Sequence, residues 1–142
     1  MPATYHIYPE ARLVYTCAVG RLAGREMIAH ATALAADPAF SPDFAQLADF
    51  QKTTVFAATA ADMRLLADHN PFDRAARRVA LVRTPIAFGM LRMYQLLCDI
   101  EESASLVTRS RRQAWAFLGR TPDVLRGAVA SAWTSDDAPA RR

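Results

Sequence analysis

The sequence predicts an α/β protein with a mixed, mostly parallel sheet of about five strands, helices packed on that sheet, and one extra helix at the carboxyl end. Two observations predict this class. Segments of strand length alternate with segments whose apolar residues recur every three or four positions, in the order β-β-α-β-α-β-α-β-α. In addition, the mostly apolar run 44–50 follows a turn-forming Ser-Pro-Asp segment, which is typical of a strand covered on both faces.

The first two strands are expected at residues 5–8 and 13–19, where β-prone residues alternate. The short turn 9–12 between them predicts antiparallel pairing, and Gly20 ends the second strand. Later strands are expected at 44–50, with a β-rich continuation over 53–56, at 79–82 and at 103–108. Since helices separate these later strands, they should run parallel through right-handed crossovers.

Helices are expected at 24–36, from Thr59 to near Asn70, from Pro85 to about Ile100, and at 111–118. Thr59 with an acid three residues later, and the Thr84-Pro85 pair, are typical helix starts, and Gly119 is a typical carboxyl cap. The third of these helices has two apolar stripes. We expect its inner stripe to comprise Ile86, Met90, Met93, Leu97 and Ile100.

The chain of 142 residues is expected to form one α/β domain over residues 1–120. An additional amphipathic helix should follow at 121–134, and a flexible polar tail at 135–142. A hydrophobic content of 52% with 22% charged residues is that of a folded protein rather than a disordered one. No apolar run approaches the roughly 18 residues that cross a bilayer, so no stable membrane insertion is expected. The first residues lack the layout of a secretion signal, so we expect a cytoplasmic location.

Several functional classes find no support in the residues. The arginines are dispersed along the chain and the net charge is only +3, so we expect no nucleic-acid binding. The two cysteines and three histidines show no metal-ligand spacing, so no metal, cofactor or disulfide is expected. No glycine-rich phosphate loop or nucleophile motif occurs, and we therefore expect no enzymatic activity.

Five local strings, in this order and spacing, resemble the SpoIIAA-like or STAS-type bacterial domains, which are similar to anti-anti-sigma factors. They are Val19-Gly20, 47–50 (LADF), 78–82 (RVALV), 88–94 (FGMLRMY) and 114–119 (AWAFLG), and together they span most of residues 5–119. The resemblance implies a small α/β domain that acts through protein contacts. In the regulatory members of that family, a serine directly after the aspartate of the central strand is phosphorylated. Phe50 follows Asp49 here, and Thr53 and Thr54 are the nearest hydroxyls, so whether either is ever phosphorylated stays open.

The main functional hypothesis is a non-catalytic, regulatory protein-interaction module that forms a homodimer and binds a protein partner. The alternative is a regulator that binds a small ligand, anion or lipid in a pocket at the carboxyl ends of the strands. The candidate binding surface is Asp49, Phe50, Lys52, Thr53, Thr54, Arg83, Thr84 and Arg92. The candidate self-association residues are Phe88, Leu91, Tyr94, Leu125, Val129 and Trp133, although such helical stripes also suit an ordinary core.

Overall fold

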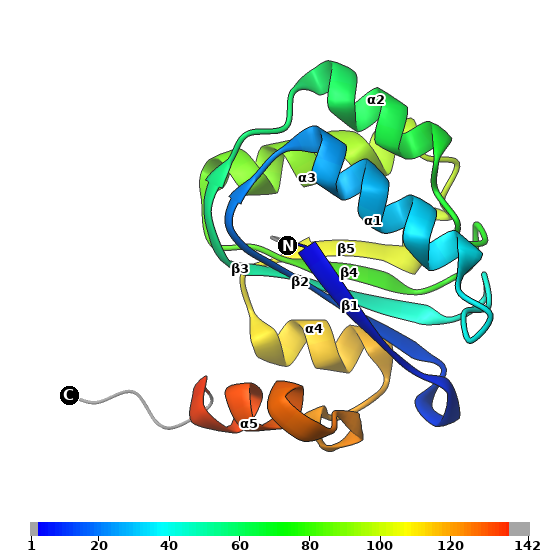
Figure 1. Ribbon diagram of the computed structural model, residues 1–142, viewed down its shortest axis with the longest axis vertical. Coiled ribbons are helices and arrows are strands. Elements are labelled where there is room, and N and C mark those ends of the chain that lie inside the picture. The colour runs from blue at the N-terminus through cyan, green and yellow to red at the C-terminus, as the bar shows by residue number, and fades with distance from the viewer. Residues whose placement is uncertain (1–2, 137–142) are drawn as a thin grey trace.

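The computed structural model describes residues 3–136 and confirms the predicted α/β class. Within that range, five strands form one sheet in the order β1-β2-β3-β4-β5 (Figure 1). The first pair is antiparallel and the other pairs are parallel, as expected. The strands are β1 (Ala3–Tyr8), β2 (Leu13–Leu22), β3 (Ala45–Phe56), β4 (Arg78–Leu81) and β5 (Ser105–Thr108).

The helices lie in two layers, one on each face of the sheet (Figure 1). From β2 to β5 each crossover moves one strand in the same direction, and right-handed crossovers therefore place their three helices on one face. The opposite face carries the last two helices (Figure 1). The helices are α1 (Gly24–Ala36), α2 (Ala60–Asp68), α3 (Pro85–Leu97), α4 (Arg111–Leu118) and α5 (Gly127–Asp136).

The strands divide their side chains between the two layers because successive residues point to opposite faces. Leu13, Leu47 and Leu81 are fully buried in the cluster beneath α4 and α5. Ala18, Ala48 and Ala80 belong to the cluster beneath α1, α2 and α3. Large side chains therefore fill the face beneath α4, whereas three alanines line the face beneath α1–α3.

Capping residues define the starts and ends that the sequence predicted. Thr59 Oγ1 accepts from the backbone N–H of Asp62 at 3.2 Å, and Asp62 Oδ2 accepts from the N–H of Thr59 at 2.8 Å. Thr84 Oγ1 accepts from the N–H of Ala87 at the start of α3. Gly119 ends α4 with a φ of 67°, a left-handed conformation that costs glycine no Cβ clash.

Several boundaries differ from those predicted. The central strand continues without a break to Phe56, because its second half keeps pairing with β2 after β4 has ended. Helix α3 ends at Leu97 rather than Ile100, and β5 begins at Ser105 after a short 3₁₀ turn. Another 3₁₀ turn, Pro122–Val124, precedes α5, which starts at Gly127. Of the tail predicted at 135–142, residues 137–142 lie outside the described residues.

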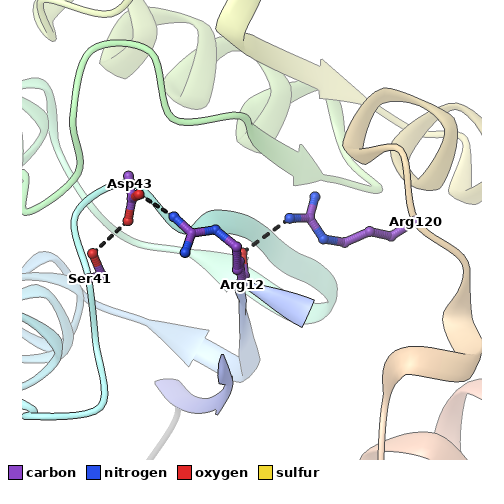
Figure 2. A network of polar contacts seen from close by, with 4 residues as sticks. All are labelled: Arg12, Ser41, Asp43 and Arg120. Carbon is purple, nitrogen blue, oxygen red and sulfur yellow. Dashed lines mark hydrogen bonds and ion pairs between the residues drawn. The ribbon is translucent and has the colours of Figure 1, made fainter. Parts of the chain in front are cut away.

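A polar network ties together three segments at the edge where the parallel strands begin (Figure 2). Arg12, which has a left-handed φ of 52°, forms an ion pair with Asp43, and Ser41 donates a hydrogen bond to the same carboxylate. From the end of α4, the Arg120 guanidinium donates to the carbonyl oxygens of Ala11 and Arg12 at 2.7 Å and 3.3 Å. The ion pair is about half exposed, so its own contribution to stability is small.

Candidate functional site

A cavity of about 90 Å³ lies between the sheet and helices α1, α2 and α3. Its floor includes Thr16, Ala48, Ala80 and Val107, which occupy one register across strands β2 to β5. Three of these four side chains are small, so the helices above cannot fill all of the space over the sheet. Pro71, which lines one end of the cavity, is partly exposed, so the cavity reaches the surface there.

A second row of residues crosses the sheet at the amino ends of three parallel strands. Gln46, Arg78 and Ser105 are register partners on β3, β4 and β5, and all three line the cavity. Arg78 Nε donates to Gln46 Oε1 at 3.1 Å. From α3, Gln95 Nε2 donates to Ser105 Oγ at 2.6 Å. The cavity therefore has a polar end at the amino edge of the strands.

Aromatic rings flank the Arg78 guanidinium. Its central carbon lies 4.3 Å from the ring centroid of Phe72 and 5.4 Å from that of Tyr94. Its two terminal nitrogens donate to Asn70 Oδ1 at 2.9 Å and to the Tyr94 hydroxyl at 3.2 Å. These ring contacts and hydrogen bonds hold the planar group in one orientation.

All of these partners of Arg78 are neutral. The ion pairs among residues 3–136 include Arg12–Asp43 and Arg74–Asp99, and Arg78 takes part in none of them. The Arg78 side chain is half buried. A guanidinium that is partly withdrawn from water without a counter-charge retains a favourable interaction for an anion.

A chain of neutral polar groups continues from Gln46 toward α1. Gln46 Nε2 donates to Thr16 Oγ1 at 3.0 Å, and that oxygen lies 3.0 Å from Nε2 of His30. Burial, and next the positive charge of Arg78, lower the pKa of His30 to about 4. His30 is therefore neutral near pH 7, and Arg78 carries the charge of this end of the cavity.

The residues predicted from β3 do not form one site. Asp49 is buried on the opposite face, where it accepts from the Tyr15 hydroxyl at 2.7 Å and from Gln51. Phe50 is buried and lines the cavity, whereas Lys52 and Thr54 are exposed. The hydroxyl of Thr53 is buried and donates to the carbonyl oxygen of Ala18 at 3.2 Å.

The residues predicted around α3 also stay apart from the cavity. The Thr84 hydroxyl caps the amino end of α3 by accepting from the N–H of Ala87, and Arg83 is exposed. Arg92 is exposed and lines a separate surface pocket of about 370 Å³. Because Glu101 and Glu102 line the same pocket, its charges are mixed and do not favour an anion.

Most of the predicted self-association residues are buried inside the chain itself. Leu91, Tyr94, Leu125 and Trp133 are 2–8% exposed, Val129 is half buried, and Phe88 is 36% exposed. The expected inner stripe of α3 was wrong at two positions, because Ile86 is 68% exposed and Leu97 is 40% exposed, whereas Met90, Met93 and Ile100 are partly buried against the core. Ala87, Leu91 and Tyr94 face the sheet instead. The exposed apolar surface of α3 is formed by Ile86, Phe88, Leu96 and Leu97.

Sequence reasoning did not single out Arg78, His30 or Gln46, and it assigned Tyr94 to self-association rather than to a cavity. One signal was present: Gln46 is a polar residue inside the mostly apolar run 44–50, and such a residue needs a hydrogen-bonding partner. The partner itself could not be named, because Arg78 comes 32 positions later and only strand pairing brings the two together.

Within the part of the chain that the structure describes, no group of three or more His, Cys, Asp and Glu side chains is placed to hold a metal ion. Nor is any helix in residues 3–136 long and apolar enough to span a bilayer. Cys17 and Cys98 are free thiols, and burial raises the pKa of each, so both remain protonated near neutral pH. Comparison of the chain with protein-family models, curated proteins and solved structures finds no match.

Proposed function

We propose that this protein is a non-catalytic regulatory protein that binds a small molecule in the cavity between its sheet and helices α1–α3. The observation that carries the proposal is the Arg78 guanidinium, which lines a largely apolar cavity and whose partners among the described residues are all neutral. A bound ligand with a negative group would supply the counter-charge that the fold itself does not.

The titration behaviour of the cavity supports binding without catalysis. A general acid or base works best when its pKa lies near the working pH. Burial lowers the pKa of His30 to about 4, and burial raises the pKa of Tyr94. Neither group exchanges a proton readily near neutral pH, so the cavity favours holding a ligand over transforming it.

The resemblance to STAS-type domains supports a regulatory role, since that family is expected to act through partner contacts. An antiparallel edge strand followed by parallel strands joined by helices agrees with the small α/β fold that the resemblance implies. A cytoplasmic location, a protein partner and a homodimer remain predictions. In this proposal, ligand occupancy beneath α1–α3 would alter the surface that those helices present to a partner.

Nitrogen-15 correlation spectra of the full chain test the binding proposal with a panel of anionic, neutral and cationic small molecules. We expect saturable shifts at amides that line the cavity, such as those of Ala48 and Ala80, and no shifts at Ala114 in α4, on the opposite face of the sheet. Ala80→Val, which fills part of the cavity, should weaken every binding event. A panel without saturable shifts at the cavity would refute the proposal.

A second candidate function is association through the outer surface of α3. Ile86 and Leu96 are 68% and 82% exposed, and large apolar side chains on one helix are typical of a contact surface. We expect a dimer by light scattering at micromolar concentration and a monomer for the double variant Ile86→Glu, Leu96→Glu. Val55→Glu changes an exposed apolar residue on β3 and should leave the mass unchanged. A wild-type monomer would exclude self-association through this surface.

A further inference from the structure

We infer that the ligand of the cavity is a short aliphatic carboxylate of about four or five carbons, with its carboxylate on Arg78 and its alkyl chain over Ala48 and Ala80. This inference rests on the proposed function and specifies the class of ligand. Charge, donor geometry and size each point to it independently.

Charge limits the ligand to a single negative group. Among the residues of 3–136 that line the cavity, Arg78 is the one that carries a charge near neutral pH, since the other polar members are Thr, Gln, Ser, Tyr and a neutral His. One guanidinium balances one carboxylate. A phosphate with nearly two negative charges would leave an excess charge in a largely apolar space, which is costly.

Donor geometry fits a planar acceptor. The Phe72 ring centroid lies 4.3 Å from the central carbon of the Arg78 guanidinium, so we expect a ligand to approach the N–H groups at the edge of that guanidinium. Each terminal nitrogen has two N–H groups and donates one of them, to Asn70 or to Tyr94. Once these contacts within residues 3–136 are counted, one N–H on each nitrogen is left, which matches the two oxygens of a carboxylate. Ser105, the register partner of Arg78, adds a hydroxyl beside it.

Size limits the alkyl part. The volume of about 90 Å³ is smaller than the roughly 150 Å³ of an engineered apolar cavity that takes benzene. Beyond the polar row the lining is apolar, and Ala48 and Ala80 leave room for methylene groups. A chain of four or five carbons fits this space, and a longer chain would have to displace α1 or α3 from the sheet.

The experiment titrates the full-length chain with butyrate, its neutral analogue butyramide, octanoate and inorganic phosphate, followed by nitrogen-15 spectra. On the wild type we expect butyrate to bind about 10- to 100-fold more tightly than butyramide, which is the usual effect of a charged hydrogen-bonded pair. Octanoate and phosphate should bind more weakly than butyrate. Arg78→Gln should remove the preference for butyrate over butyramide. Arg78→Lys keeps the positive charge but lacks the paired N–H donors of the guanidinium, so this variant should retain part of the preference.

Ala80→Val keeps the experiment decisive if the Arg78 variants do not fold. This variant should weaken butyrate binding while leaving Arg78 in place. Equal binding of butyrate and butyramide, both weakened by Ala80→Val, would overturn the carboxylate assignment and leave the binding function standing. Tighter binding of octanoate or phosphate would overturn the assignment of a short chain or of a carboxylate, respectively. An absence of binding by all four probes would overturn both this inference and the proposed function.

Discussion

Arg78 and Gln46 begin neighbouring parallel strands, and the guanidinium of the first donates to the amide oxygen of the second at 3.1 Å. The Gln46 amide nitrogen then donates to Thr16 on the next strand. One glutamine therefore satisfies a charged donor on one side and a hydroxyl on the other. This bridge crosses three strands, and it places the one charged group that residues 3–136 contribute to the cavity lining at a defined point on the sheet.

Replacing Gln46 with leucine should destabilise the protein. The variant keeps a side chain of similar size but leaves Arg78 Nε and the Thr16 hydroxyl without this partner, and a buried polar group left unpaired costs about 1–3 kcal/mol. Urea unfolding followed by circular dichroism measures the change. Thr54→Ala, an exposed change on the same strand, should stay within about 0.5 kcal/mol. A Gln46→Leu protein as stable as the wild type would contradict the bridging role.

His30 should make stability depend on pH in the acidic range. Its pKa falls from about 6.5 in the unfolded chain to about 4 in the folded protein, because of burial and the charge of Arg78. At pH values between these two pKa values, the unfolded state binds more protons than the folded state. The contribution of His30 to stability therefore decreases as pH falls from about 6.5 to about 4, and it is constant at lower pH. The loss is up to about 3 kcal/mol.

The measurement is the free energy of unfolding at a series of pH values for the wild type and for His30→Gln. The difference in free energy of unfolding between wild type and His30→Gln should change between about pH 6.5 and about pH 4. His69 is exposed on the surface, and His69→Gln is the matched control that should follow the wild type. Parallel curves for wild type and His30→Gln would show that His30 is not held neutral.

Removing the Asp49 carboxylate should cost stability on the other face of the sheet. Asp49→Ala leaves the buried Tyr15 hydroxyl and the side-chain amide of Gln51 without their acceptor, at a cost of about 1–3 kcal/mol. Asp49→Asn retains one acceptor oxygen and should cost less. Thermal and urea unfolding provide the values, and Asp68→Ala, an exposed acidic residue at the end of α2, is the control. Ligand titrations should be unaffected, because Asp49 does not line the cavity.

Two helical glycines should respond to alanine with opposite signs. A Cβ at Gly24 would clash with the Asp62 side chain, which is held by the capping box with Thr59. Gly24→Ala should therefore displace that carboxylate and lose about 1 kcal/mol or more of cap energy. Gly89 lies in the middle of α3 with open space around it, so Gly89→Ala should stabilise by about 0.5–1 kcal/mol.

A double-mutant cycle checks the cause of the Gly24 effect. In an Asp62→Ala background the clash is absent, and Gly24→Ala should cost little. If Gly24→Ala is equally destabilising in both backgrounds, the clash with Asp62 is not the cause.

Local signals in the sequence determined much of the fold. The span of α1, the capping box of Thr59 and Asp62, the proline-led start of α3 and the glycine end of α4 were all predicted, because each depends on residues within one or two turns of the chain. The parallel direction of β2 to β5 followed from the helices between them. These features involve short-range chemistry and a general rule of chain geometry.

The tertiary structure alone decided which stripe of α3 faces inward and where the polar groups meet. Helix α3 is apolar on more than one side, so periodicity could not choose between Leu91 with Tyr94 and Ile86 with Leu97. The cavity depends on strand register, which brings Gln46, Arg78 and Ser105 from three distant segments into one row. Register and helix orientation result from packing summed over the whole sheet, and no local stretch of sequence contains that information.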